Sequence, residues 1–267
     1  MEIHTRRFGP NERQLLGLLQ SPQVGKPRRA AFLMCRPFGQ EAVRTTPIFR
    51  AGSDRLAREG CPVLTFDAHG CGDAPGEIDG ASLAEWALDT LVADEQLRVD
   101  APGYPIHWFG MGLGANIAAA AALRAKDAPS CLVLWEPVLD GPAYLQRLMK
   151  VHRGELAREM GFEWEQLVRR GLAEEPELPG SVLGFTVGPR LHQDLLGLGS
   201  VPIENLVHRG IRTIIVADSA QSSKLNPAEK VGAHLQALEA ATDWMSTEAF
   251  GTAIVPQEIL RTLLSTL

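Results

Sequence analysis

The chain has 267 residues, of which 45% are hydrophobic and 22% charged, and a formal net charge of −6. This composition is typical of a globular protein with a large core, and the acidic balance argues against nucleic acid as a partner. No apolar run reaches the roughly 18 residues of a membrane span, and the start "MEIHTRRFGPNER" lacks the apolar segment of a signal peptide. We therefore expect a cytoplasmic protein without a membrane span.

The cysteines fit a reducing compartment. Cys35, Cys61 and Cys131 lie in or beside apolar runs, where buried free thiols are expected. Cys71 differs because it lies in the glycine-rich segment "DAHGCGDAPGE". No C-x-x-C pair and no two histidines at ligand spacing occur, so we predict neither a metal site nor a cofactor.

Strand-like and helix-like segments alternate along the chain. "EIHTRRF" and "RQLLGLLQ" around the turn "GPNE" predict a hairpin at the start. Further strands are expected at 30–36, 62–67, 105–109, 131–135, 211–217 and 242–250. Helices are expected at 47–60, 82–98, 115–126, 227–240 and 256–267. This alternation predicts a mostly parallel, eight-stranded sheet with helices on both faces.

One stretch, residues 139–209, interrupts this alternation with charged, helix-like pieces broken by Gly and Pro. We interpret it as a lid inserted into a core made of residues 1–138 and 210–267. An insertion after the sixth strand would cover the carboxyl end of the sheet, where proteins of this class bind their ligands.

The segment "HWFGMGLGANIAAAA" at 107–121 predicts a strand, a glycine turn and a helix. Two known devices have this form. One is the G-x-S-x-G nucleophile elbow of α/β-hydrolases, with Gly112 in place of the serine. The other is the G-x-G-x-x-A dinucleotide fingerprint, made here of Gly110, Gly112 and Ala115, with Glu136 near the spacing of its ribose-binding carboxylate.

The elbow explains more of the chain, because the fingerprint normally lies on the first strand of its domain. Here a hairpin and two strand–helix units precede the turn, which is the α/β-hydrolase order. The loop "RPFGQE" then takes the place of the oxyanion loop, and the lid follows the sixth strand. The expected oxyanion-hole and pocket residues are Phe38, Gly39, Gln40, Glu41, Met111 and Leu113.

Four segments together resemble a narrower family: "CRPFGQEAVRTTPIFR", "FDAHGCGDAPGE", "WFGMGLGA" and "LWEPVLDGPAYLQRL". They are similar to the exosortase A system-associated hydrolases, and most similar to the branch called hydrolase 2. The resemblance implies an α/β-hydrolase fold and a link to exosortase and exopolysaccharide genes of Gram-negative bacteria. It implies little about activity, since the family name rests on the fold.

The catalytic triad of this fold is incomplete in the sequence. Gly112 has no side chain to act as nucleophile, and the acid position is met by Asp218 after the seventh strand or Glu136 after the sixth. The last histidine, His234, lies in a predicted helix, and no histidine follows it. We therefore expect a non-catalytic or very weak hydrolase-like protein that binds a small or lipid-like ligand, or a protein partner.

Two alternatives stay open. An active hydrolase or acyltransferase would need unusual groups, either His69 with Cys71 or the paired carboxylates of Glu41 and Glu136. The simpler interpretation is that His69 and Cys71 belong to a turn and that both glutamates hydrogen-bond loops. The second alternative is an NAD(P)-binding oxidoreductase built on the fingerprint.

Overall fold

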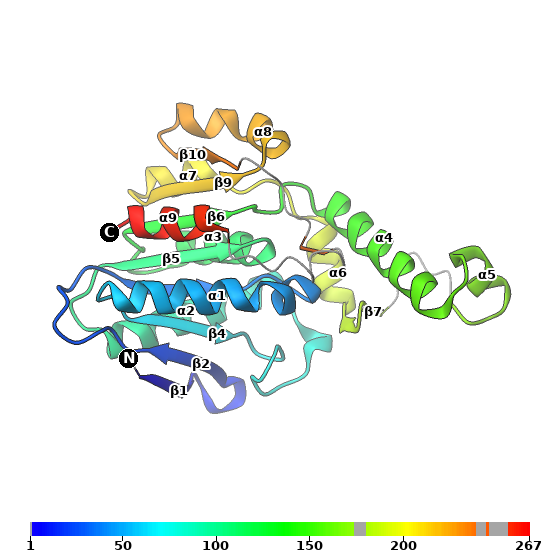
Figure 1. Ribbon diagram of the computed structural model, residues 1–267, viewed down its shortest axis with the longest axis horizontal. Coiled ribbons are helices and arrows are strands. Elements are labelled where there is room, and N and C mark those ends of the chain that lie inside the picture. Colours follow the sequence, from blue (N-terminus) through cyan, green and yellow to red (C-terminus); the bar gives the residue numbers. More distant parts are fainter. Residues whose placement is uncertain (1, 174–179, 239–243, 246–255) are drawn as a thin grey trace.

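The computed structural model describes residues 2–173, 180–238, 244–245 and 256–267 (Figure 1). The strands are β1 (Ile3–Phe8), β2 (Leu15–Gln20), β3 (Ala31–Cys35), β4 (Val63–Asp67), β5 (Ile106–Met111), β6 (Cys131–Trp135), β7 (Ser181–Val182), β8 (Phe185–Thr186), β9 (Arg212–Ala217) and β10 (His234–Ala237). The α-helices are α1 (Gln40–Arg58), α2 (Leu83–Asp100), α3 (Leu113–Arg124), α4 (Gly141–Met160), α5 (Trp164–Arg169), α6 (Pro189–Leu196), α7 (Ile203–His208), α8 (Ser219–Lys230) and α9 (Gln257–Ser265). Two short 3-10 helices are η1 (Asn11–Arg13) and η2 (Ile78–Gly80).

The central sheet of the described chain has eight strands in the order β1-β2-β4-β3-β5-β6-β9-β10. β1 pairs with β2 and β2 with β4 in antiparallel fashion, and the other neighbours are parallel. The predicted hairpin and mostly parallel eight-stranded sheet are therefore confirmed. In β3, β5 and β6 every residue is buried, as expected for strands that are covered on both faces.

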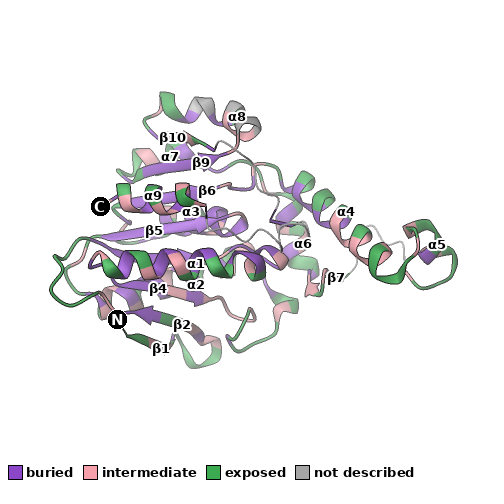
Figure 2. Ribbon diagram, viewed as in Figure 1, coloured by how far each residue is buried: buried purple, intermediate pink, exposed green. Residues whose placement is uncertain are grey.

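Helices cover both faces of the sheet (Figures 1 and 2). On one face α2 and α3 pack together against the central strands, and α7 contacts both α3 and β9. The apolar cluster there includes Leu33, Trp108 and Ile215. On the other face α1 and α9 contact each other over a second cluster, which includes Phe109 and Val133. Burial of such side chains stabilises the fold by about 1.5–3 kcal/mol each.

A cap made of α4, α5, the β7–β8 hairpin and α6 lies beyond the carboxyl ends of the parallel strands (Figure 1). α4 contacts α5, α6 and β7, and α6 contacts η2 of the core. A third apolar cluster joins cap to core, with Tyr144 and Leu191 from the cap and Phe38 and Leu113 from the core. No helix in the described ranges is both long and apolar enough to cross a membrane.

Two boundaries differ from the sequence prediction. α1 begins at Gln40 instead of 47, so Pro47 lies inside the helix, where its ring is exposed to solvent. The helix predicted at 227–240 is wrong, because α8 ends at Lys230 and β10 follows at His234–Ala237. α8 begins after Asp218, whose side chain accepts from the Gln221 backbone N–H. β10 is thus the eighth strand, and the strand predicted at 242–250 lies, apart from residues 244–245, outside the described residues.

Candidate functional site

The glycine turn between β5 and α3 has the geometry of a nucleophile elbow. Gly112 has φ 55° and ψ −129°, a backbone conformation that is strained for any residue with a Cβ. Its N–H donates to Trp135 O at 2.9 Å, and its carbonyl accepts from Ala115 N at 3.0 Å. A Cβ on Gly114 would collide with the Arg36 carbonyl oxygen, so the close approach of α3 to the loop after β3 requires glycine there.

The carboxylate of Glu41 occupies the space in front of Gly112. A Cβ built on Gly112 would lie 3.2 Å from Glu41 Oε2 and 3.3 Å from the Pro37 Cβ. Glu41 belongs to the first turn of α1 and is only 8% exposed. The Tyr144 hydroxyl of the cap donates to Glu41 Oε2 at 3.4 Å. A carboxylate therefore stands beside the bend where the fold normally places a hydroxyl nucleophile.

Glu136 follows β6 and is held in an unusual conformation. Its φ is 44°, and its backbone N–H donates to Val216 O at 2.7 Å. Its Oε2 accepts from the indole N–H groups of Trp135 and Trp244, each at 3.2 Å. Burial, and to a smaller degree the charge of Asp218, raises the pKa of Glu136 from 4.5 to about 7, against the lowering effect of the two indoles. This carboxyl group is therefore poised to exchange a proton near neutral pH.

These groups line one cavity of about 450 Å³, which we call the elbow cavity. Its wall carries four acidic, two basic and two aromatic side chains: Glu41, Glu136, Asp140, Asp218, Arg147, Lys224, Tyr144 and Trp244. Gly112 and Met111 form its floor from the end of β5. The volume suits a small molecule, and the mixed charges suit a polar one.

Asn116 in α3 fixes the loop that carries Glu136. Its side-chain amide donates to Val138 O at 2.7 Å, and its side-chain oxygen accepts from Val138 N at 2.8 Å. Both partners are buried, so these bonds satisfy backbone groups that water does not reach. The loop after β6 is thereby tied to the helix that begins at the elbow.

Of the sequence-predicted residues, Glu41, Met111, Gly112, Glu136 and Asp218 come together on the elbow cavity. Asp218 also caps α8 through its side chain, which gives it a structural role.

Other predicted residues lie elsewhere. Phe38 and Gly39 line a second cavity, Gln40 is the first residue of α1, and Leu113 is fully buried in the cluster beneath the cap. Between the end of β3 and the start of α1, Pro37 is the residue that lines the elbow cavity, and it has no N–H to donate to an oxyanion.

The His69 and Cys71 pair does not join this site. Cys71 lines the second cavity, and burial, followed by the charges of Asp67 and Asp89, raises its pKa to about 12. The thiol is therefore protonated at neutral pH and is a poor nucleophile. The His69 backbone N–H donates to Asp89 Oδ2 at 3.0 Å. His69 is not among the described residues that line either cavity.

No histidine of the described chain lines the elbow cavity. His234 lies at the start of β10, which runs parallel to β9, so it is at the amino edge of the sheet. His107 is buried within β5, and burial lowers its pKa to about 4. No histidine follows His234 in the sequence.

Sequence reasoning missed several residues of the wall, among them Tyr144, Arg147, Lys224 and Trp244. Tyr144 and Arg147 lie three residues apart on α4 and so share a face of that helix. They follow Glu136 within the segment "LWEPVLDGPAYLQRL", and this spacing is the signal from which they could have been found. Trp244 gives no local signal, because its indole reaches Glu136 from 108 residues away.

The dinucleotide alternative does not fit this geometry. A pyrophosphate needs the N–H groups at the start of α3, but the buried carboxylate of Glu41 lies directly before that helix. The strand order, with the turn on the fifth strand after an antiparallel hairpin, also differs from a dinucleotide-binding unit.

Solved structures of several hydrolases resemble the chain in fold. A monoglyceride lipase from Saccharomyces cerevisiae aligns with TM-score 0.66 and 16% identity over 99% of this chain and 95% of that one. A carboxyl esterase from Bacillus coagulans aligns with TM-score 0.61 and 14% identity over 97% of this chain and 99% of that one. A proline iminopeptidase from Mycobacterium smegmatis aligns with TM-score 0.57 and 15% identity over 99% of this chain and 100% of that one. No curated protein sequence matches significantly.

A family model also matches residues 27–174, which is more than half of the chain and runs from before β3 to beyond α5. Its family is described as serine aminopeptidase, S33. The predicted α/β-hydrolase fold is confirmed by the sheet and by these comparisons, and the chain belongs to the serine aminopeptidase S33 family of hydrolase-like proteins.

Proposed function

We propose that the protein binds a small polar ligand in the elbow cavity and does not perform acyl transfer through an elbow nucleophile. The observation that carries the proposal is that the Glu41 carboxylate fills the space in front of Gly112. Gly112 has no side chain, and Glu41 Oε2 lies 3.2 Å from where its Cβ would be. The carboxylate makes this part of the wall a recognition surface for a polar group.

The expected rate supports this proposal. Loss of triad members costs about a million-fold in kcat, and what remains is on the order of 10³–10⁴ over water. Here nucleophile and histidine are both missing, while the acid-position residue Asp218 caps α8. We therefore expect the protein to act by binding a ligand in the elbow cavity and not by turning it over.

The ligand is proposed to carry groups of both charges. Glu41 and Asp218 favour an ammonium group, and Arg147 and Lys224 favour a carboxylate or phosphate on the same wall. A long acyl chain finds fewer partners there, so we favour a small polar ligand over a lipid-like one. The cap proposed as lid consists of α4 to α6, since α7 packs on the core.

Glu136 supports a second candidate, an active hydrolase that uses carboxyl groups. Its pKa of about 7 lets it take a proton from water and return it near neutral pH, and Glu41 lines the same cavity. This candidate requires no side chain at Gly112.

One assay series separates the two candidates. Wild type, Glu136→Gln and Gly112→Ser are tested with p-nitrophenyl acetate, p-nitrophenyl butyrate and L-prolyl-p-nitroanilide. The binding proposal expects at most a residual turnover far below about 1 s⁻¹ in all three proteins, unchanged by Glu136→Gln. A wild-type kcat near the ordinary enzymatic range of about 1 s⁻¹ or more, lost in Glu136→Gln, would establish the second candidate instead.

Binding is tested by thermal unfolding with L-amino acids and dipeptides, which carry both charges. A binding compound raises Tm with concentration, because it favours the folded state. Arg147→Gln should lose the response, whereas Lys126→Gln, at an exposed site beyond α3, should keep it. If no compound raises Tm at 10 mM (roughly the weakest useful affinity), the proposed ligand class is wrong.

We also propose a role in an exosortase-linked exopolysaccharide system, which rests on the sequence resemblance alone. Deletion of the gene in its host should then reduce or alter the exopolysaccharide, and unchanged polysaccharide in composition and amount would argue against that role.

A further inference from the structure

A second cavity of about 330 Å³ lies between the core and the β7–β8 hairpin of the cap. We call it the aromatic cavity, because Phe38, Phe66, Trp86 and Phe185 all line it. Among the described residues it shares only Pro37 with the elbow cavity. Its occupant can therefore differ from the polar ligand proposed for the elbow cavity.

The aromatic rings of this wall come from core and cap. The Phe38 ring lies 5.7 Å from that of Trp86 in α2 and 6.3 Å from that of Phe185 in β8, centroid to centroid. The Phe185 ring also lies over Gly39, where a built Cβ would come within 3.6 Å of it. These distances are those of aromatic groups in contact, so the wall joins ring surfaces of the core to one of the cap.

Some apolar surface inside the aromatic cavity is left uncovered by folding. Five residues that pack against the apolar cluster between cap and core are only half-buried, and all five line the cavity: Ala68, Cys71, Ile78, Ile117 and Phe185. An apolar molecule in the cavity would remove this surface from water. Burial of such surface is the main favourable contribution to binding in an apolar pocket.

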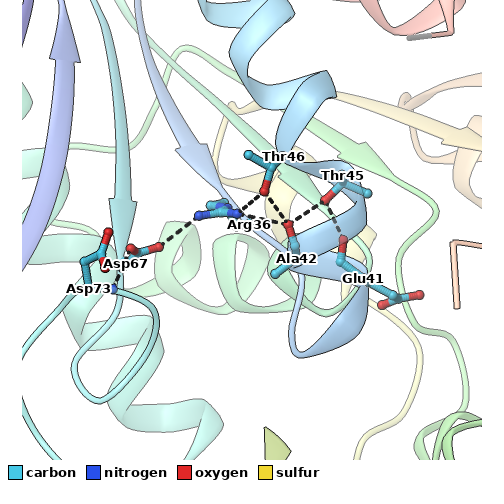
Figure 3. A network of polar contacts seen from close by, with 7 residues as sticks. All are labelled: Arg36, Glu41, Ala42, Thr45, Thr46, Asp67 and Asp73. Atoms are coloured by element: carbon cyan, nitrogen blue, oxygen red, sulfur yellow. Dashed lines mark hydrogen bonds and ion pairs between the residues drawn. The ribbon is translucent and has the colours of Figure 1, made fainter. Parts of the chain in front are cut away.

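The two charged side chains among the described residues of the wall, Arg36 and Asp67, are paired with each other (Figure 3). Arg36 Nη1 donates to Asp67 Oδ1 at 3.2 Å, and its Nη2 donates to Ala42 O at 2.9 Å and Thr46 Oγ1 at 2.7 Å. Asp67 Oδ2 accepts from the Asp73 backbone N–H at 3.1 Å. A charged ligand would leave water for a wall whose cation and anion already have partners, which is costly.

We propose that the aromatic cavity binds an uncharged, flat aromatic molecule of about two fused rings, held by ring packing and shape alone. An apolar cavity of about 150 Å³ holds one benzene molecule, so 330 Å³ suits a molecule of about twice that size. Aromatic walls favour a ring system over a flexible chain, because ring–ring contacts add to area burial and a rigid molecule loses no internal rotations. Naphthalene has this size, and 2-naphthoate adds a charge to the same rings.

The test uses the full chain with ¹³C-labelled isoleucine δ1 methyl groups, whose resonances are followed by NMR. Ile78 and Ile117 line the cavity, and their resonances are assigned as those lost in Ile78→Val and Ile117→Val. Naphthalene should shift both through its ring current, with a Kd below about 1 mM. It should leave the resonance of Ile259, in α9 on the other face of the sheet, in place. We expect 2-naphthoate to bind at least about tenfold more weakly.

One pair of variants tests the ring of the cap. Phe185→Leu removes this ring and keeps an apolar side chain, so the Kd for naphthalene should rise about threefold or more. Phe162→Leu is the matched control, because Phe162 is also a half-buried phenylalanine of the cap but does not line the aromatic cavity. Its Kd should equal that of the wild type.

A second pair tests the space in the cavity. Ala68→Leu adds volume to the wall and should raise the Kd at least about fivefold, because the enlarged side chain competes with the ligand for the same space. Ala128→Leu is the matched control at a half-buried loop alanine outside the aromatic cavity, and it should bind as the wild type does. Thermal unfolding verifies that each variant is folded.

The proposal is overturned if naphthalene leaves the Ile78 and Ile117 resonances in place, or shifts that of Ile259 as strongly. It is also overturned if 2-naphthoate binds as tightly as naphthalene, or if Phe185→Leu and Ala68→Leu bind naphthalene as tightly as the wild type. None of these outcomes depends on the ligand of the elbow cavity.

Discussion

The Tyr144 hydroxyl in α4 donates to Glu41 Oε2 in α1 at 3.4 Å and joins two residues 103 positions apart. One belongs to the cap and the other to the core, so this bond closes the wall of the elbow cavity. Burial, together with the nearby Glu41 charge, raises the pKa of Tyr144 well above its usual value of 10.0. The hydroxyl therefore remains a donor over the whole working pH range.

Tyr144→Phe removes this donor and keeps the ring. We expect a loss of about 0.5–1.5 kcal/mol in unfolding free energy and faster hydrogen exchange along α4. Tyr104→Phe is the control, because Tyr104 is half-buried against Arg28 at the surface and should change stability by less than about 0.5 kcal/mol. Unchanged exchange in α4 would mean that the bond does not hold the cap.

Gly112→Ala tests the backbone and the space at the elbow. The positive φ costs about 1–3 kcal/mol for a residue with a side chain, and contact with Glu41 Oε2 and the Pro37 Cβ adds to it. Gly103 has φ 79° but nothing within 4 Å of a built Cβ, so Gly103→Ala carries the strain alone. Urea unfolding should show the larger loss for Gly112→Ala; equal losses would mean that the elbow is not crowded.

Glu136 makes stability depend on pH. Its pKa is about 7 in the folded protein and near 4.5 when unfolded, so between these values the folded state holds the extra proton and stability falls as pH rises. The loss of unfolding free energy caused by burying the ionised carboxylate is absent below pH 4.5 and fully present above pH 7, where it is on the order of 3 kcal/mol.

Glu136→Gln should remove this dependence, so its stability relative to wild type should rise between pH 5 and pH 8. Urea unfolding at both pH values measures the difference. Glu12→Gln, at an exposed position of the hairpin turn, should follow the wild-type curve. Parallel curves for wild type and Glu136→Gln would show that burial does not perturb this carboxyl.

Asp89 anchors the turn of the first hairpin to α2. Arg13 donates to its two carboxylate oxygens at 2.7 and 2.9 Å, and the side chain is almost fully buried. Asp89→Ala should cost about 3–5 kcal/mol, because it leaves Arg13 and the His69 N–H without their acceptor. Glu59→Ala, which breaks a partly exposed pair with Arg55, should cost less than about 1 kcal/mol in the same denaturation assay.

The sequence allowed the sheet to be predicted because its central strands are continuous apolar runs. β5 is buried along its whole length, and α2 begins after Ser82, whose side chain accepts from the Glu85 backbone N–H. Local chemistry determines these features. The start of α1 was missed because Pro47 is typical of a helix start, whereas here it lies on the exposed side of a longer helix.

The candidate site was only partly predictable, for a different physical reason. Glu41, Gly112 and Glu136 each follow a parallel strand, so the topology alone brings them to one edge. Tyr144 and Trp244 reach the same cavity through packing of the cap and of a distant segment, which no local periodicity encodes. The end of α8 was missed because the helical spacing continues past Gly232, whose φ of 96° belongs to the turn before β10.

Pro37 lies on the walls of both cavities. Its fixed backbone φ and closed ring make it a stiff part of both walls. A substitution at this one position would therefore reshape both cavities at once.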